Sequence, residues 1–205
     1  MKRNHFYFFW RAVTMPFFKL IFRTKYIGKE NVPAEGGYIL ASNHSRAVDP
    51  ILIGIGLKRQ VNFMAKEELF RNKFVSWFLR KLGAFPVDRG KADTGSIRHF
   101  EEVLNEGSLI GIFIEGTRSK DGEFLPPKNG CSLIAWDTKA PVIPICHTKI
   151  GKRVWLHYGK PLSMEELGFD KGGAREFRNA SRIIMDHIKA LREEDQTAYE
   201  AKKNG

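Results

Sequence analysis

Cysteine is scarce in this sequence. Only Cys131 and Cys146 occur among its 205 residues, too few for a disulfide framework and without the spacing of metal ligands. We therefore expect a protein of a reducing compartment that binds no metal ion, with both thiols packed as small buried hydrophobic side chains. The composition, 42% hydrophobic and 28% charged, is that of one compact globular domain with a hydrophobic core.

Acidic residues are missing from the start of the chain. The first one is Glu30, and the segment before it carries seven of the eleven net positive charges. These charges are Lys2, Arg3, Arg11, Lys19, Arg23, Lys25 and Lys29. Because aromatic residues are interleaved with them, the segment favours an anionic partner, either a membrane surface or a nucleic acid.

The sequence also lacks a hydrophobic run long enough to cross a membrane. Arg11 and Lys19 interrupt residues 4–23, which therefore fall short of the ~20 apolar residues that a span requires. No small-residue cleavage site follows this segment. We therefore expect neither a transmembrane span nor a signal peptide.

Residues 4–23 instead have the pattern of an amphipathic helix. Apolar residues recur at spacings of three and four, at Phe6, Phe9, Trp10, Val13, Phe17, Leu20 and Ile21. Because acidic residues are absent, we interpret the segment as a helix that lies in the plane of an anionic membrane interface. The alternative is a helix that packs its aromatic face on the core. Pro16 is expected to kink or break the helix.

Strand-like and helical patterns alternate through the rest of the chain. Strands are predicted at residues 38–42, 61–65, 84–87, 109–114, 142–146 and 154–157, and helices at 50–58, 73–82, 94–105 and 131–138. A short helix at 163–167, a longer one at about 174–191 and a frayed polar tail follow. The alternation predicts a single α/β domain whose mostly parallel sheet is flanked by helices, with functional residues at the carboxyl ends of strands.

His44 and Asp49 are the first candidates for catalysis. His44 follows the strand 38–42, and Asp49-Pro50 has the character of a helix start, with Asp as N-cap and Pro as the first helical residue. On one helix the two side chains would lie roughly 140° apart, so they can meet only across a turn. Asp49 could then orient His44 as a general base toward a hydroxyl. The alternative is a capping Asp beside an unrelated strand-end histidine.

Cations follow other predicted strands. Lys66 ends the strand 61–65, Arg89 follows 84–87, and Arg118 lies in Glu115-Gly116-Thr117-Arg118-Ser119 after 109–114. Guanidinium and hydroxyl donors suit a phosphate or a carboxylate. For each cation taken alone, the alternative interpretation is an ordinary exposed surface residue. Together with His44 they indicate a site for a phosphorylated substrate that bears a nucleophilic hydroxyl.

The order of these residues resembles the glycerolipid acyltransferases, of the 1-acyl-glycerol-3-phosphate acyltransferase type. The first block of that family, Asn-His, four residues and Asp, matches Asn43, His44 and Asp49. The second, a glycine, an aromatic residue and Val-Asp-Arg, matches residues 83–89, with its upstream Lys-x-Glu-Leu element at 66–69. The third, Phe-x-Glu-Gly-Thr-Arg-Ser, matches residues 113–119 in full, and its usual continuation is met by Gly122, Lys128 and Gly130. The fourth, an apolar strand with two prolines, matches residues 141–145.

This sequence departs from the family pattern in two places. Arg46 stands where the family commonly has Ser, and Ser45 is instead adjacent to the histidine. The segment before the first block is also shorter than the two-helix membrane anchor that some members carry. The resemblance therefore implies an interface helix at residues 1–24 and an acyltransferase domain at residues 25–205.

The resemblance also implies a reaction and roles. A fatty acyl chain passes from a thioester to the sn-2 hydroxyl of 1-acyl-glycerol-3-phosphate (lysophosphatidic acid), giving phosphatidic acid without a covalent intermediate. His44 is the base and Asp49 its partner. Arg118, Arg89 and Lys66 hold the acceptor phosphate, and Glu115, Gly116 and Thr117 organise that pocket. The co-substrate is acyl-CoA or an acyl carrier protein, with no cofactor.

Other interpretations keep part of this pattern. The acceptor could be glycerol 3-phosphate or another lysolipid, or the fold could be retained without activity. A basic nucleic-acid-binding domain predicts salt-dependent binding of DNA or RNA. We favour the acyltransferase, at the cytoplasmic face of the cell membrane, because the positive excess lies on an aromatic amphipathic helix and no nucleic-acid recognition motif is present.

Overall fold

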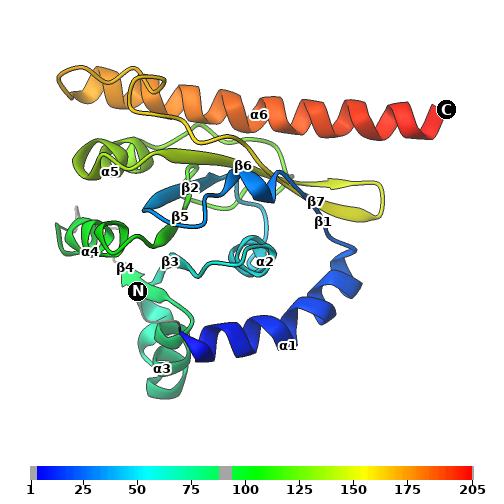
Figure 1. Ribbon diagram of the computed structural model, residues 1–205, viewed down its shortest axis with the longest axis horizontal. Helices are drawn as coiled ribbons and strands as arrows, with labels where there is room; N and C mark the ends of the chain where they lie inside the picture. Colours follow the sequence, from blue (N-terminus) through cyan, green and yellow to red (C-terminus); the bar gives the residue numbers. More distant parts are fainter. Residues whose placement is uncertain (1–3, 88–93, 205) are drawn as a thin grey trace.

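The computed structural model describes residues 4–87 and 94–204 (Figure 1). Its strands are β1 (Lys25–Ile27), β2 (Tyr38–Ser42), β3 (Val61–Lys66), β4 (Ala84–Val87), β5 (Leu109–Phe113), β6 (Val142–Ile150) and β7 (Arg153–Tyr158). Its α-helices are α1 (His5–Phe22), α2 (Asp49–Gly56), α3 (Lys73–Lys81), α4 (Thr94–Asn105), α5 (Gly130–Thr138) and α6 (Ala174–Asn204). Short 3-10 helices are η1 (Lys29–Asn31) and η2 (Glu67–Phe70).

Within the described residues the strands form a seven-stranded sheet in the order β1-β7-β6-β2-β5-β3-β4. β6 and β7 pair antiparallel, and the other neighbouring strands pair in parallel. Parallel neighbours need crossover connections, which the intervening helices supply. The predicted α/β fold with a mostly parallel sheet is confirmed.

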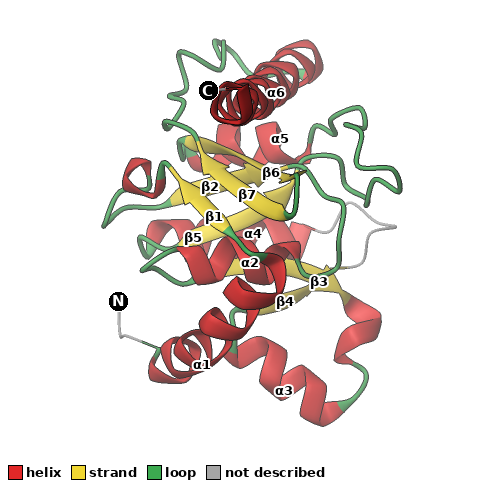
Figure 2. Cartoon of the chain, turned by 90° about the vertical axis from the view of Figure 1, so that its right-hand side faces the viewer, coloured by secondary structure: helices red, strands yellow, loops and turns green. Residues whose placement is uncertain are grey.

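The sheet separates two hydrophobic clusters, and β2 contributes to both. Ile39 and Ala41 pack with residues of α4, α5 and α6, whereas Leu40 packs with α2 on the other face. Successive side chains of a strand point to opposite faces, so a strand covered on both sides is apolar throughout. Figures 1 and 2 show α5 and α6 on one side of the sheet and α1 and α2 on the other.

Helix α1 is apolar on two sides. On its inner side Tyr7 is buried, and Phe18 and Phe22 pack against the cluster beneath α2. On its outer side the exposed residues are Phe9, Val13, Phe17, Leu20 and Ile21. The helix therefore packs on the core, as one of the two interpretations predicted, and still presents an apolar stripe outward.

Pro16 was expected to kink or break this helix, and the helix continues through it without a break. The axis bends in its second half (Figure 1), as expected of a proline kink. Among the described residues, no helix combines the length and the apolar character that a membrane crossing requires.

Three elements differ from the prediction. β1 was missed because three residues are too short for a periodic signal. Residues 163–167 form a turn rather than a helix, closed by the Ser163 amide donating to Glu166 at 2.7 Å. α6 continues to Asn204 where a frayed tail was expected. Its extension is held on β7 by the buried Asp195, which lies 3.1 Å from Nδ1 of His157.

Candidate active site

The carboxyl ends of several parallel strands meet at one edge of the sheet. Ser42, the last residue of β2, lies opposite Phe113, the last residue of β5. Lys66 at the end of β3 lies opposite Val87 at the end of β4. The loops that follow these strands therefore emerge side by side, which is where the sequence predicted the functional residues.

His44 and Asp49 meet across a turn. Nδ1 of His44 lies 2.9 Å from Oδ2 of Asp49, and both side chains are buried. The same oxygen accepts the backbone N–H groups of Ser45 at 2.8 Å and Arg46 at 2.7 Å. An ionised carboxylate can only accept hydrogen bonds, so the proton of His44 lies on Nδ1.

The predicted capping role of Asp49 is wrong. The N-cap of α2 is Val48, and Asp49 is already helical, since its N–H donates to the Arg46 carbonyl oxygen at 3.1 Å. Its carboxylate therefore bonds amides that precede the helix instead of the free amides of the first turn. This places Asp49 under the His44 loop, where it holds the loop and the imidazole together.

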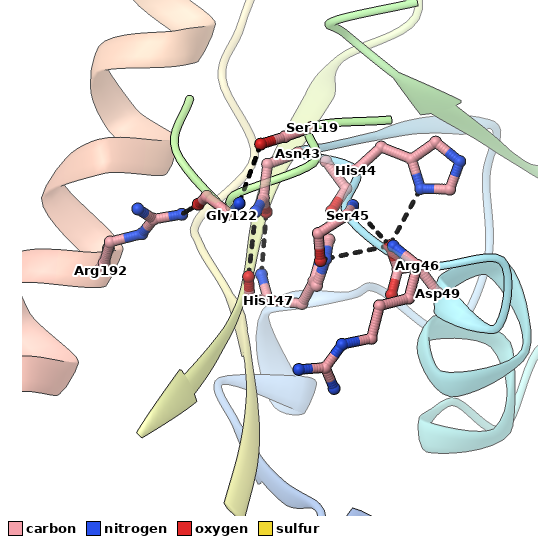
Figure 3. A network of polar contacts seen from close by, with 10 residues as sticks. Asn43, His44, Ser45, Arg46, Asp49, Ser119, Gly122, His147 and Arg192 are labelled. Carbon is pink, nitrogen blue, oxygen red and sulfur yellow. Dashed lines mark hydrogen bonds and ion pairs between the residues drawn. The ribbon is translucent and has the colours of Figure 1, made fainter. Parts of the chain in front are cut away.

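A second histidine contacts the same carboxylate. Nε2 of His147 lies 3.0 Å from Oδ2 of Asp49 and 3.0 Å from Oγ of Ser45 (Figure 3). Asn43 fixes the backbone there, because its side chain accepts the His147 N–H at 3.0 Å and donates to the His147 carbonyl at 2.9 Å. His147 is buried.

Sequence reasoning missed His147, although a signal was present. The residue directly follows the predicted strand 142–146, and the same strand-end criterion had selected Lys66 and Arg89. β6 runs on to Ile150 and lies next to β2, with Ile145 opposite Ser42. That neighbour relation could not be predicted from the sequence, because the two strands are far apart in the chain.

The surroundings of Asp49 favour its ionised form. Burial alone would raise its pKa, but hydrogen bonds from His147, His44 and the Arg46 amide hold the pKa well below its usual range. A permanently charged carboxylate beside Nδ1 stabilises the imidazolium form of His44.

The outer nitrogen of His44 is available. Among the described residues nothing hydrogen-bonds to Nε2, and the side chain keeps 11% of its surface exposed. The ring is held by stacking on Phe113, with ring centroids 3.8 Å apart and an interplanar angle of 14°. Phe113 in turn stacks on Phe63 at 5.8 Å. The imidazole of His44 is therefore held in one orientation, by Asp49 at Nδ1 and by Phe113 at the ring face.

The loop after β5 is tied to this histidine. The Ser119 N–H donates to the His44 carbonyl at 2.8 Å, and the Lys128 N–H donates to the Ile114 carbonyl at 2.7 Å. Gly116 has a φ of 69°, which favours glycine, and its N–H donates to the Phe113 carbonyl at 2.9 Å. Helix α6 secures the outer part of the loop, because Arg192 donates to the Gly122 carbonyl at 2.9 Å (Figure 3).

The predicted phosphate-binding residues that the structure describes follow β3 and β5, at the edge of the sheet that carries His44. Lys66, Thr117 and Arg118 are exposed at the same edge, with Arg118 adjacent to the tethered Ser119. In the described part of the chain, no ion pair joins these cations to His44 or Asp49. Arg89 lies outside the described residues.

Glu115 is buried beneath the loop, with only 1% of its surface exposed. Burial raises the pKa of its carboxyl to about 7. The backbone amides of Leu125 and His44 oppose this shift, but neither makes a hydrogen bond of normal geometry to the carboxylate. Glu115 is therefore a group that changes charge near neutral pH.

An apolar cavity of about 240 Å³ opens beside the site. Its walls come from α1, α2, α3 and the strands β3 and β4. Phe63 and Pro50 line it, and these residues adjoin the His44 stack and Asp49. In the described part of the chain no cluster of three or more His, Cys, Asp or Glu side chains could hold a metal ion.

Comparisons with known proteins show the family to which the chain is similar. A family described as Acyltransferase matches residues 23–148. A Bacillus subtilis protein named 1-acyl-sn-glycerol-3-phosphate acyltransferase is 44% identical over 124 residues, 60% of this chain and 61% of that protein. A Streptococcus pneumoniae protein of the same name is 28% identical over 190 residues, 87% of this chain and 69% of that protein. The match thus spans about three fifths of the length of the Bacillus relative.

The fold has a solved counterpart. The crystal structure of the 1-acyl-sn-glycerophosphate (LPA) acyltransferase PlsC from Thermotoga maritima superposes with a TM-score of 0.64 and 24% identity. The superposition covers 94% of this chain and 84% of that chain. The likeness confirms the fold class.

Glu115 gives the structure a testable pH dependence. Its pKa in the folded state is raised, so the unfolded chain releases this proton at about pH 4.5 and the folded chain only near pH 7. Stability therefore falls across this window as pH rises, because the folded state binds more protons. The Glu115→Gln variant lacks this titrating group, so its stability does not fall in this way. Its free energy of unfolding should therefore rise relative to that of the native chain as the pH goes from 4.5 to 7.

Urea unfolding at several pH values measures this difference. Glu106→Gln, at an exposed position, is the matched control, and its free energy of unfolding should differ little from that of the native chain at every pH. If the difference in free energy of unfolding between Glu115→Gln and the native chain did not change with pH, the buried, proton-binding state of Glu115 would be contradicted.

Proposed function

The chain belongs to the acyltransferase family, and from that membership we propose that it acylates the sn-2 hydroxyl of 1-acyl-glycerol-3-phosphate, giving phosphatidic acid. The observation that carries the proposal is the oriented His44–Asp49 pair, with Nε2 unoccupied by any described residue, beside an apolar cavity. The names of the Bacillus and Streptococcus relatives support lysophosphatidic acid as the acceptor.

His44 performs the proton transfers. Its Nε2 removes the proton of the acceptor hydroxyl as the oxygen attacks the thioester carbonyl, and Asp49 stabilises the imidazolium that results. The C–S bond then breaks, and the imidazolium returns the proton to the departing thiolate. Each step uses the same nitrogen, so one base serves both directions of proton transfer.

The cysteines support a mechanism without a covalent acyl-enzyme. Cys131 and Cys146 are both buried, and burial raises the pKa of each thiol to about 12. A thiol in this state is a poor nucleophile because the reactive form is the thiolate. In this proposal the acyl chain passes directly from donor to acceptor.

The cations at the strand ends hold the acceptor phosphate in this proposal. Arg118 is the main candidate, because Ser119 next to it is bonded to the His44 backbone at 2.8 Å. Lys66 and Arg89 assist, and Glu115, Gly116 and Thr117 shape the loop. The basic surface suits acyl-CoA and acyl carrier protein alike, since both donors are anionic.

The apolar cavity is the proposed site of an acyl chain. Its lining is almost wholly hydrocarbon, and it begins at Phe63 and Pro50, close to the reacting atoms. An acyl chain placed there leaves water, which is favourable in proportion to the apolar area buried.

The outer stripe of α1 is the proposed membrane contact. Phe17 is 61% exposed and Leu20 is 79% exposed, on a segment without acidic residues. Such a helix lies at the interface of an anionic bilayer. The free thiols fit the cytoplasmic side, where cysteines stay reduced.

Replacing His44 tests the base. His44→Ala is expected to keep the fold and to lower kcat about 100- to 10,000-fold, the range for loss of a general base. Turnover of lysophosphatidic acid with acyl-CoA and with acyl carrier protein measures this effect. His187→Ala, an exposed histidine on α6, is the control. Native-like turnover in His44→Ala would remove His44 from the mechanism.

Replacing Arg118 tests the phosphate site. Arg118→Ala is expected to raise the acceptor KM roughly 10- to 100-fold, because it removes charge-assisted hydrogen bonds, with a smaller effect on kcat. The neighbouring exposed Lys120→Ala is the control. Glycerol 3-phosphate and lysolipids with other headgroups, assayed in parallel, identify the acceptor. An acceptor KM equal to that of the native chain would exclude Arg118 from phosphate binding.

A further inference from the structure

Helix α3 and the turn η2 before it carry large apolar side chains on their outer side. Phe74 is 73% exposed and Trp77 is 50% exposed, and Leu69 and Val75 beside them are also exposed. None of the residues of α3 is buried. Leaving this much aromatic and aliphatic surface in water is costly and marks an interaction site.

This outer side adjoins the stripe of α1. The Phe6 ring of α1 packs edge-on against the rings of Trp77 and Phe78, with centroid distances of 5.4 Å and 5.8 Å. The Asn4 side chain also donates to the Lys81 carbonyl at the end of α3, at 2.9 Å. Figures 1 and 2 show α1 and α3 at the same end of the molecule, away from α6. The exposed apolar side chains of α3 therefore lie next to the N-terminal end of α1, joined to it through Phe6.

The charges around α3 select an anionic partner. Arg71, Lys73, Arg80 and Lys81 are all exposed on or beside the helix. Glu67 and Glu68 lie in η2, and the described part of α1 has no acidic residue. Aromatic residues flanked by cations are the composition of elements that enter the headgroup region of an anionic bilayer.

We propose that η2 and α3 form a second membrane-contact element, in which Leu69, Phe74 and Trp77 enter an anionic lipid surface beside α1. This inference rests on the proposed function in that the substrate is a lipid. The inner sides of the same helices line the apolar cavity, through Trp10 and Thr14 on α1 and Phe78 and Leu79 on α3. Docking of both outer sides therefore brings the cavity to the bilayer surface.

Vesicle sedimentation tests the contact. The probes are phosphatidylcholine vesicles with and without phosphatidylglycerol, and the protein is the full chain. The double variant Phe74→Ala/Trp77→Ala is expected to lower partitioning onto the anionic vesicles about tenfold or more, because two large side chains no longer leave water. Phe74→Leu/Trp77→Leu should restore most of the binding, and Lys189→Ala/Glu193→Ala, on the exposed side of α6, should change nothing.

Two results would overturn the contact. One is partitioning of the double alanine variant equal to that of the native chain. The other is a change in oligomeric state on size exclusion without a change in partitioning, which would make this surface an interface between two copies. Turnover of a short-chain, monomeric acceptor separates this proposal from the function itself. Turnover of this acceptor should be the same in the double variant as in the native chain. If the native chain does not turn it over, that result counts against the proposed reaction and not against the membrane contact.

A second inference comes from the polar network. Oδ2 of Asp49 lies at hydrogen-bond distance from two imidazoles, His44 at 2.9 Å and His147 at 3.0 Å. Since the carboxylate can only accept, Nε2 of His147 carries a proton. Its other nitrogen, Nδ1, faces the Ser42 hydroxyl at 3.4 Å, which can donate to it.

We propose that His147 is a positioning residue of the same reaction. It fixes the Asp49 carboxylate toward the His44 loop, so that the carboxylate stays aligned on Nδ1 of His44. The ionisable groups around this carboxylate come from four parts of the fold. His44 follows β2, Glu115 follows β5, His147 lies on β6, and Asp49 opens α2.

Steady-state kinetics test this role separately from acceptor binding. In His147→Leu the Asp49 carboxylate loses one of its two imidazole donors, so kcat should fall about tenfold while the acceptor KM stays close to the native value. His147→Gln can still donate to Asp49 and should restore most of kcat. A residue that only packs would lower stability in both variants and leave kcat unchanged, and that result would overturn the proposal.

Discussion

The buried carboxylate of Asp49 is the constraint on which the site depends. A buried charge is tolerated only when donors surround it, and here four groups converge on one oxygen: the imidazoles of His44 and His147 and the amides of Ser45 and Arg46. These donors come from the loop after β2 and from β6. The loop after β2 must therefore fold back over α2, and β6 must lie beside β2, which is the strand order observed.

Much of this arrangement could be predicted because it is local. The central strands are continuous apolar runs that end in polar residues, so their positions and the edge that carries the site follow from the sequence alone. The role of Asp49 as a cap was wrong because a one-residue shift of the helix start turns its carboxylate to the preceding loop. His147 and the length of α6 depend on contacts between distant segments, β6 with β2 and Asp195 with His157, which no local pattern encodes.

Helix α1 shows why one sequence pattern allowed two interpretations. The sequence posed a choice between a helix packed on the core and a helix in the plane of an anionic membrane interface. Its apolar residues extend around more than one face, so Tyr7 is buried while Phe9 and Phe17 stay exposed. Helix α3 repeats the arrangement, with Phe78 toward the cavity and Phe74 outward. Each helix has one apolar side that lines the cavity and another apolar side that is exposed.

Each chemical part of the proposed acceptor has a counterpart in this site. A monoacylated glycerol phosphate carries an apolar chain, a hydroxyl and a dianionic headgroup on a short backbone. In the proposal the apolar cavity takes the chain, Nε2 of His44 meets the hydroxyl, and the exposed cations Lys66 and Arg118 take the phosphate. An apolar chain in the cavity fixes one end of such a molecule, and a phosphate on the cations fixes the other. The hydroxyl between them is then left to meet the one imidazole nitrogen that no described residue occupies.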